Sequence, residues 1–298
     1  MKRYAFFVGC TIKAALPQIE TVARKVLPLL DIELEDLAFS CCPNSDFRST
    51  DEYSWLVVAA RNIALAEKEG LDILSLCPGC TQTLREANIL LKDDESLRTS
   101  VNKRLEKIGL IFMGTLEVNH HLVLLQQHID TLRNKVTTPL YGIKLAAHTG
   151  CHLLMPSHIM QFDNPEQPRK LEELIGIVGA TPVDYQEKTF CCGFGLFGSQ
   201  KETASMIIKD KVESAAMAGA DAFVVPCPSC FQQLDRNQLV AKRGLKFEAQ
   251  LPVLYYIQTL GLSMGLSLEE VGYFSGRVRS PELEEKIQSL AQKAAVNV

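Results

Sequence analysis

Ten cysteines, arranged as two matching sets of five, constrain the fold of this chain more than any other feature. Each set contains a lone cysteine, an adjacent pair and a Cys-x-x-Cys motif, and in both sets 34 residues separate the pair from that motif. Such an internal repeat indicates two similar structural units in succession. The sets are Cys10, Cys41, Cys42, Cys77 and Cys80, followed by Cys151, Cys191, Cys192, Cys227 and Cys230.

The cellular compartment of the protein determines whether these thiols are reduced or form disulfides. The apolar run 4–8 near the amino terminus is too short for a signal peptide. The uncharged stretch 251–268 contains a proline, two glycines and several hydroxyl side chains, so it predicts a buried helix and no membrane span. We therefore expect a cytoplasmic protein with reduced thiols. The net charge of −4 over 298 residues lacks the strong positive field that nucleic-acid binding requires.

Apolar runs alternate with helical patterns in both halves. Runs that resemble short buried strands lie at 4–10, 72–76, 145–151 and 221–225, and each leads into a cysteine. Helical patterns lie at 55–68, 83–91, 122–132, 202–217, 231–237 and 253–262. This alternation predicts an α/β fold of two pseudo-repeated domains, each a short parallel sheet flanked by helices. Ligands of such sheets gather beyond the carboxyl ends of the strands, where the cysteines are expected.

The boundary between the two domains is expected in a polar connection. The segment 133–139 is polar and ends in a proline, so we divide the chain into domains 1–138 and 139–298. The second domain is longer because it contains a polar, proline-containing loop at 161–169 and a charged helix after Gly276.

Five thiols per set suit some metal centres better than others. Structural zinc takes four tetrahedral ligands and would leave one sulfur unused in each half. Iron–sulfur clusters usually take four thiolates, and a fifth could bridge two irons or serve as a spare ligand. Disulfides within the adjacent pairs would be strained. On the residues alone, iron–sulfur clusters, a zinc-stabilised scaffold and buried free thiols all stay open.

The cysteine motifs resemble the cysteine-rich CCG domain, which occurs in the B subunit of heterodisulfide reductase and its relatives. The resemblance extends from Met1 to about Gly265, and Pro43 departs from it because the domain has glycine there. Proline lacks the backbone N–H that could donate to a cluster. The motifs are Ser40-Cys41-Cys42-Pro43, Phe190-Cys191-Cys192-Gly193, Cys77-Pro78-Gly79-Cys80 and Cys227-Pro228-Ser229-Cys230, and segments 4–10, 59–62, 163–166 and 252–255 resemble that B subunit in particular.

The resemblance implies that each five-cysteine set binds a noncubane [4Fe-4S] cluster, with all ten cysteines as ligands. It implies that the substrate is the mixed disulfide of coenzymes M and B, cleaved between the clusters. Disulfide reduction needs two electrons, so each cluster would supply one. The chain has no flavin or nucleotide fingerprint of its own. The implied partners are a small ferredoxin-like subunit and a flavin-containing subunit of the same complex.

A few other residues are candidates for catalysis or substrate binding. His148 and His152 flank Cys151, and histidine titrates near neutral pH, so either is a candidate proton donor. Lys13, Arg48 and Lys201 are candidates for binding the sulfonate and phosphate of the implied substrate. The alternative function is an electron-transfer subunit of a heterodisulfide-reductase-like or quinone-linked dehydrogenase complex that acts on another substrate.

Overall fold

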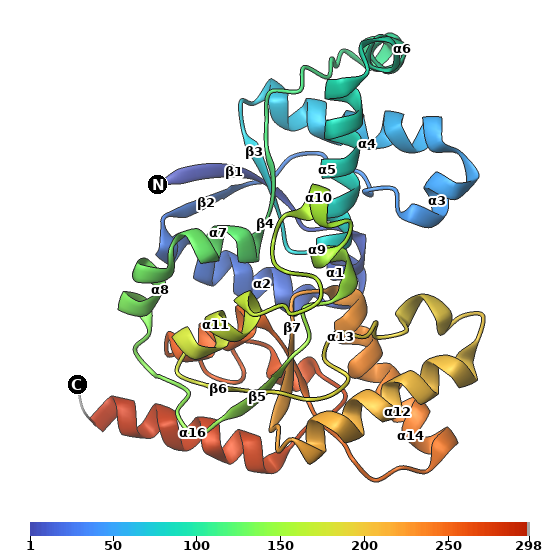
Figure 1. Cartoon of the computed structure of the whole chain (residues 1–298). Coiled ribbons are helices and arrows are strands. Elements are labelled where there is room, and N and C mark those ends of the chain that lie inside the picture. The colour runs from blue at the N-terminus through green and yellow to red at the C-terminus, as the bar shows by residue number, and fades with distance from the viewer. Residues whose placement is uncertain (297–298) are drawn as a thin grey trace.

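Two parallel four-stranded sheets with the same strand order form the centre of the molecule (Figure 1). The computed structural model describes residues 1–296. The orders are β2-β1-β3-β4 and β6-β5-β7-β8. The strands are β1 (Lys2–Phe7), β2 (Ile32–Glu35), β3 (Asp72–Ser75), β4 (Val118–His120), β5 (Lys144–Ala147), β6 (Thr181–Val183), β7 (Ala222–Val225) and β8 (Val253–Tyr255).

All six strand pairs are parallel, so the carboxyl ends of neighbouring strands lie at the same edge of each sheet. In the first sheet Phe6 is opposite Leu74, and in the second Ala146 is opposite Phe223. Beyond their first residues the central strands are mostly apolar and buried, as expected where helices cover both faces of a parallel sheet. The β1 and β5 strands lead into the lone cysteines, and β3 and β7 lead into the Cys-x-x-Cys motifs.

Helices cover the two sheets in a similar way in both halves (Figure 1). Those of the first half are α1 (Cys10–Ala15), α2 (Pro17–Val26), η1 (Leu27–Leu30), α3 (Ser45–Thr50), α4 (Glu52–Lys68), α5 (Pro78–Asp93), α6 (Glu95–Leu105), η2 (Glu106–Ile108), α7 (His121–Gln127) and α8 (Ile129–Lys135). Those of the second half are α9 (Cys151–Leu154), α10 (Ser157–Met160), α11 (Lys170–Ile177), η3 (Phe194–Leu196), α12 (Lys201–Met217), α13 (Pro228–Leu234), α14 (Arg236–Leu245), α15 (Tyr256–Ser263), η4 (Tyr273–Ser275) and α16 (Pro281–Val296).

The hydrophobic core follows the alternation of side chains along β1. Ala5 and Phe7 point to one face of the first sheet and pack with α4 and α5. Tyr4, Phe6 and Val8 point to the other face, and their cluster continues through α2 into the second half. The α2 helix packs against α15, and α7 packs against α11. One core therefore joins the two halves.

The proposed division at 138/139 falls in the connection between α8 and β5. The backbone N–H groups of Thr137 and Thr138 both donate to the carbonyl of Ser263, at 3.0 and 2.9 Å. This connection is therefore attached to the end of α15 in the second half. The polar segment at 161–169 is a loop, as predicted, and the C-terminal α16 buries Leu283 and Ile287 against the core.

The predicted fold class is confirmed, and the edge strands are the main additions. Each sheet has two strands that the sequence patterns did not reveal: β2 and β4 in the first, β6 and β8 in the second. The helix predicted from Val253 was wrong at its start, because 253–255 form β8 and the helix begins at Tyr256. The missed strands have only three or four residues, too few to show a clear period of two. Within residues 1–296, no helix has the length and apolar character needed to cross a membrane.

Candidate functional site

The Cys-x-x-Cys motifs lie where the second central strand of each sheet gives way to a helix. Cys77 is the N-cap of α5, and Cys227 is the N-cap of α13. Proline follows each of them at the first helical position, where its fixed φ suits the helix and its missing N–H is not needed. The sulfurs therefore gather at helix N-termini, whose partial positive charge stabilises thiolates and other anions.

The lone cysteines begin α1 and α9, and a glycine with positive φ precedes each of them. Gly9 has φ +82° and Gly150 has φ +80°. A Cβ atom on Gly9 would lie 3.0 Å from the Cys80 sulfur, and one on Gly150 would lie 3.4 Å from the Cys230 sulfur. Glycine is needed here both for its backbone conformation and for this close approach.

The five sulfurs of each set converge. In the first set the Cys42 and Cys80 sulfurs are 2.8 Å apart and the Cys10 and Cys41 sulfurs 3.8 Å apart. Hydrogen bonding with Cys41 and Cys80 lowers the pKa of the Cys42 thiol to about 6. In both sets the lone cysteine and the first cysteine of the pair are exposed, whereas the second cysteine of the pair is buried. Each set is thus open to solvent on one side.

The second set has the same pattern of thiol contacts. Hydrogen bonds from Cys151 and Cys192, together with one from the Gly193 N–H at 3.4 Å, lower the pKa of the Cys191 thiol. Cys192 and Cys230 lie together with the ring of His148, and the ligand atoms of the three lie within 4.8 Å of one another. These contacts mark a place where several thiolates could hold one metal centre.

The loops that carry the adjacent pairs are held differently in the two halves. In the first half the Trp55 indole N–H donates to the Pro43 carbonyl at 2.9 Å. The Asn62 amide donates to the Cys41 carbonyl at 3.1 Å and accepts from the Ser40 N–H at 2.9 Å. In the second half Ser205 and Val212 stand at the positions of Trp55 and Asn62, counted from the adjacent pair. There Gly193 supplies its own backbone N–H, which Pro43 lacks.

The two cysteine sets face each other across the boundary between the halves. The α9 helix, which begins at Cys151, packs against α5, and α1, which begins at Cys10, packs against α13. Figure 1 shows α9 and α10 lying beside α5. A Cβ atom on Gly79, between Cys77 and Cys80, would lie 3.3 Å from Nδ1 of His152. His152 therefore reaches from the second cysteine set to the first.

A buried tyrosine connects the two Cys-x-x-Cys loops. The Tyr255 hydroxyl lies 2.7 Å from the Leu76 carbonyl and 2.5 Å from the Pro226 carbonyl. Leu76 and Pro226 are the residues directly before the two motifs. His120 Nε2 also contacts the Leu76 carbonyl at 3.0 Å, and its Nδ1 accepts from a backbone N–H. Because Nδ1 accepts, the ring proton is on Nε2, which donates to the Leu76 carbonyl. A carbonyl oxygen has two lone pairs, so the Tyr255 hydroxyl can donate to either the Leu76 or the Pro226 carbonyl.

The predicted proton donors differ in their surroundings. His152 is exposed, although partial burial lowers the pKa of its ring. His148 is buried, and within the described residues 1–296 neither of its ring nitrogens has a hydrogen-bond partner. Burial, together with the charge of Lys211, lowers the pKa of His148 to about 3. His148 is therefore a neutral ring beside the second set, whereas His152 lies between the sets.

The predicted substrate-binding cations lie on three separate helices. Lys13 on α1 and Lys201 at the start of α12 are exposed. The Arg48 guanidinium is bound by the carboxylates of Glu86 at 2.6 Å and Glu52 at 2.8 Å, and lies 4.7 Å from the centre of the Trp55 ring. The charge of Arg48 is thus already balanced by two carboxylates.

Sequence reasoning missed the residues that support the cysteine loops. Trp55 is buried, and its indole N–H donates to the Pro43 carbonyl in the loop of the first pair. Asn62 and Tyr255 stand out in the sequence only as members of segments that resemble a family. Both are polar side chains within apolar patterns near a cysteine motif, and that feature could have indicated a role in supporting the cysteine loops. Lys211 gave no signal, because its burial depends on the tertiary fold.

The donor atoms of both sets fit an iron–sulfur centre. Each set offers five soft thiol ligands whose contacts are mainly with one another, and glycines allow the backbone to approach them closely. Cysteine-rich CCG domains with such cysteine groups indicate iron–sulfur binding.

Comparison with known proteins agrees with this geometry. The model of the CCG family, a cysteine-rich domain, matches residues 4–85 and 145–235. The chain is 37% identical to the B subunit of the ferredoxin/F420H2-dependent CoB-CoM heterodisulfide reductase of Methanosarcina acetivorans, over 98% of this chain and 99% of that protein. It is 36% identical, with the same coverage, to the B subunit of the ferredoxin:CoB-CoM heterodisulfide reductase of Methanosarcina mazei. The word subunit implies that these relatives work with other chains.

Two further similarities widen the comparison. The membrane anchor subunit of 8-methylmenaquinol:fumarate reductase from Wolinella succinogenes is 33% identical over 91% of this chain and 95% of that protein. A hypothetical protein of known structure from Helicobacter pylori has the same fold, with a TM-score of 0.78, 16% identity and 94% of this chain covered. This chain spans about half, 53%, of that structure. The relatives named as reductases suggest an oxidoreductase. The chain belongs to the family of the heterodisulfide reductase B subunit, built from two CCG cysteine-rich domains.

Proposed function

We propose that this chain is the catalytic subunit of a heterodisulfide reductase, which reduces the mixed disulfide of coenzymes M and B to two thiols. The observation that carries the proposal is the mutual approach of the two cysteine sets, in which the lone-cysteine helix of each half packs against the Cys-x-x-Cys helix of the other. A disulfide bound at this boundary would meet both sets at once. The names of two relatives specify that substrate for those proteins.

Under this proposal, each set of five cysteines binds a noncubane [4Fe-4S] cluster. When bound, each cluster supplies one electron. The reaction breaks one S–S bond, takes up two electrons and two protons, and releases two thiols. The protein supplies the orientation of the substrate and the charges around it.

We propose that His152 gives a proton to a departing sulfur, because it lies between the two sets and is open to solvent. His148 would place its neutral ring beside the cluster of the second set, because one of its ring nitrogens lies within 4.8 Å of the Cys192 and Cys230 sulfurs. Lys13 and Lys201 are exposed cations for the sulfonate and phosphate of the substrate. Arg48 could join them only if it exchanges its carboxylate partners, Glu52 and Glu86.

The electrons must come from other chains, because the sequence contains no motif for a soluble donor. We propose that a ferredoxin-like subunit delivers them, and that a flavin-containing subunit lies behind it. The subunit designation of the relatives supports a complex of this kind. Co-purification from the native host would test it, and an isolated chain that is fully active with its physiological donor would contradict it.

The decisive experiment is low-temperature EPR of protein prepared without oxygen, with iron and sulfide counted on the same sample. We expect about eight irons per chain, as two four-iron clusters require, and a new paramagnetic signal when the coenzyme M or coenzyme B thiol is added. Zinc without sulfide would instead indicate a structural scaffold.

A second candidate function has its own support, because the chain is 33% identical to one chain of a menaquinol:fumarate reductase. In that case the clusters would only relay electrons within a quinone-linked complex. A relay needs no site for a thiol. Clusters that load fully but give the same EPR spectrum with and without both thiols would favour this function over the reductase.

A further inference from the structure

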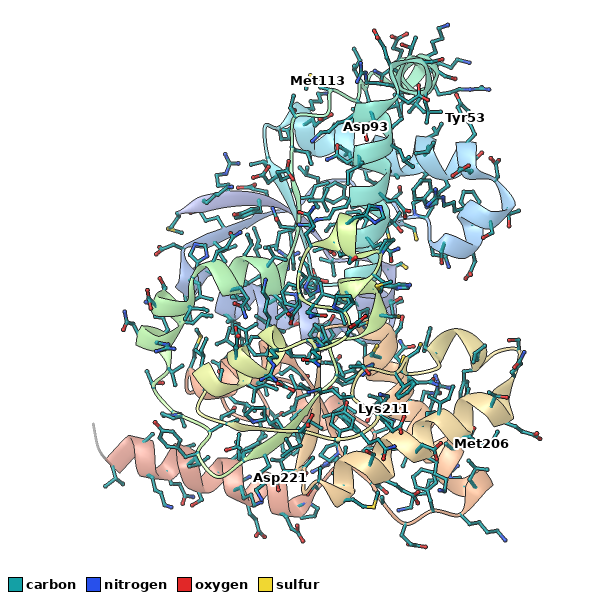
Figure 2. The ribbon with its side chains drawn as sticks, viewed as in Figure 1. Tyr53, Asp93, Met113, Met206, Lys211 and Asp221 are labelled. Carbon is teal, nitrogen blue, oxygen red and sulfur yellow. The ribbon has the colours of Figure 1, made fainter. Side chains whose placement is uncertain are left out.

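A lysine lies buried in the second half, on the helix α12. This helix packs against α13, which begins after Cys227, and against η3, which follows Cys192 and Gly193. Lys211 on α12 is 1% exposed, and its Nζ donates to the backbone carbonyl of Glu187. Its ammonium group lies 5.6 Å from the centre of the Tyr185 ring. Figure 2 labels Lys211 on the same helix as Met206, which is 48% exposed, so α12 presents one side to solvent and Lys211 to the interior.

No carboxylate pairs with this lysine among residues 1–296. The other two lysines near it on α12 differ, since Lys209 is paired with Glu213 at 2.6 Å and Lys201 is exposed. Burial lowers the pKa of Lys211 to about 8, and the negative charges that oppose this shift are those of Cys192, Cys230, Glu187 and Cys191. An unpaired buried ammonium group is costly, so a nearby anion is required to compensate it. Three of the four candidate anions are cysteines of the second set.

Among the described residues 1–138, no lysine or arginine is as deeply buried as Lys211, and Arg85 on α5, which donates to the Val118 and Met160 carbonyls, is half-buried. Arg61 stands at the position of Lys211, counted from the adjacent cysteine pair, but it is only half-buried. Its guanidinium donates to the Ala38 carbonyl at 3.1 Å, in the loop before the cysteine pair. Phe7 stands where the second half has His148, three residues before the lone cysteine. A half-exposed charge is screened by water and salt, whereas a buried one is not.

We propose that Lys211 makes the second cysteine set the site of higher reduction potential, so that the first electron to enter the chain is held there. This inference rests on the proposed function, since it requires a cluster in each set. A one-electron reduction adds one negative charge to the cluster without breaking a bond. A buried positive charge stabilises that reduced state, and the potential of such clusters depends on net charge and solvent exposure. The electron donor is the ferredoxin-like partner named above.

The test is a potentiometric titration followed by EPR on the loaded protein without substrate. In the unaltered protein we expect two reduction steps, and equal potentials would overturn the proposal without any variant. Lys211→Gln keeps a donor for the Glu187 carbonyl but removes the charge. It should lower the reduced-to-oxidised ratio of one cluster at least tenfold at fixed potential, which is about 59 mV for one electron. Lys211→Arg, which keeps the charge, should largely restore the ratio.

Lys209→Met on the same helix and Arg61→Met at the equivalent position should each change the ratio less than threefold. Combining Lys211→Gln with Cys80→Ser, which is expected to empty the first set, shows whether the shifted cluster is the second one. If Lys211→Gln shifts the reduction potential of the first cluster, or of neither cluster, this inference is wrong. The proposed function would still hold in that case, provided that both clusters are present and respond to the thiols. If the unaltered protein, prepared without oxygen, contained neither cluster, the proposed function itself would be wrong.

Discussion

The two halves of this protein share one cysteine pattern, but different groups stabilise the loops that carry the adjacent cysteine pairs. In the first half, side chains from α4 reach the loop of the adjacent pair, with Trp55 bound to the Pro43 carbonyl and Asn62 bound to the Cys41 carbonyl. In the second half the Gly193 N–H donates to the Cys191 sulfur within the loop, and from α12 the buried Lys211 donates to the Glu187 carbonyl. A repeated fold therefore fixes where cysteines lie but leaves open which groups support them.

The surroundings of the two sets differ in the same way. Beside the first set, Phe7 packs against Phe39 with ring centres 4.9 Å apart. Beside the second set, His148 and Lys211 are buried polar groups. Matching ligands in unlike surroundings are expected to give two sites with different redox properties, because hydrogen bonds and burial tune such centres.

The largest expected effect comes from removing one ligand from each half in turn. Cys80→Ser and Cys230→Ser change two buried cysteines at equivalent positions. We expect each to remove about half of the iron and sulfide, because each set should hold its own cluster of about four irons. Iron and sulfide analysis of the purified variants measures this. If either variant lost all its iron, the two sets would not be independent and the comparison between halves would fail.

Next in size is the tyrosine that links the halves. Tyr255→Phe removes the hydroxyl that contacts the carbonyls before both Cys-x-x-Cys motifs. The free energy of unfolding should fall by about 1–3 kcal/mol, since a buried carbonyl loses its donor. Tyr256→Phe is the matched control, because its buried hydroxyl donates at 3.0 Å to Leu174 within the second half.

Both tyrosine variants should lose similar stability in denaturant unfolding, but only Tyr255→Phe should change the EPR spectra of both clusters. A spectrum that changes in one cluster alone would show that Tyr255 serves one half and does not join the two.

The sequence predicted the features that the two halves share, and it did not predict the features in which they differ or the contacts between them. The parallel sheets and the cysteines at the strand ends followed from two copies of one pattern, each with apolar strands before Gly9-Cys10 and Gly150-Cys151. The three-residue strands β4 and β8 were missed because so short a run shows no periodicity. The approach of His152 to Gly79 depends on how the halves pack together. No spacing within the chain reveals such a contact.

A smaller effect is expected from the glycine of the second loop. Gly193 has φ +78°, and a Cβ atom there would lie 3.3 Å from Cδ1 of Ile207. Gly193→Ala should therefore lower the free energy of unfolding by about 1–2 kcal/mol, the cost of a left-handed conformation with a side chain. Gly195→Ala in the same loop is the control, because a Cβ there meets nothing within 4 Å. Equal losses in urea unfolding would show that the loop as a whole, and not Gly193, is sensitive.

The smallest effect is expected from the ion pairs at the amino ends of the two central strands. Lys2 binds Asp72 at 2.8 Å in the first half, and Lys286 binds Asp221 at 2.6 Å in the second. Both lysines are exposed, so Lys2→Ala and Lys286→Ala should each cost less than about 1 kcal/mol. The loss should nearly vanish in about 1 M salt, where screening is strong. Lys293→Ala on α16 controls for the lost side chain. If Lys286→Ala lowered the free energy of unfolding by more than this, and the loss persisted in salt, the aliphatic part of Lys286 would anchor α16 by apolar contact. The two halves would then differ at this end of their sheets as well as at their cysteine loops.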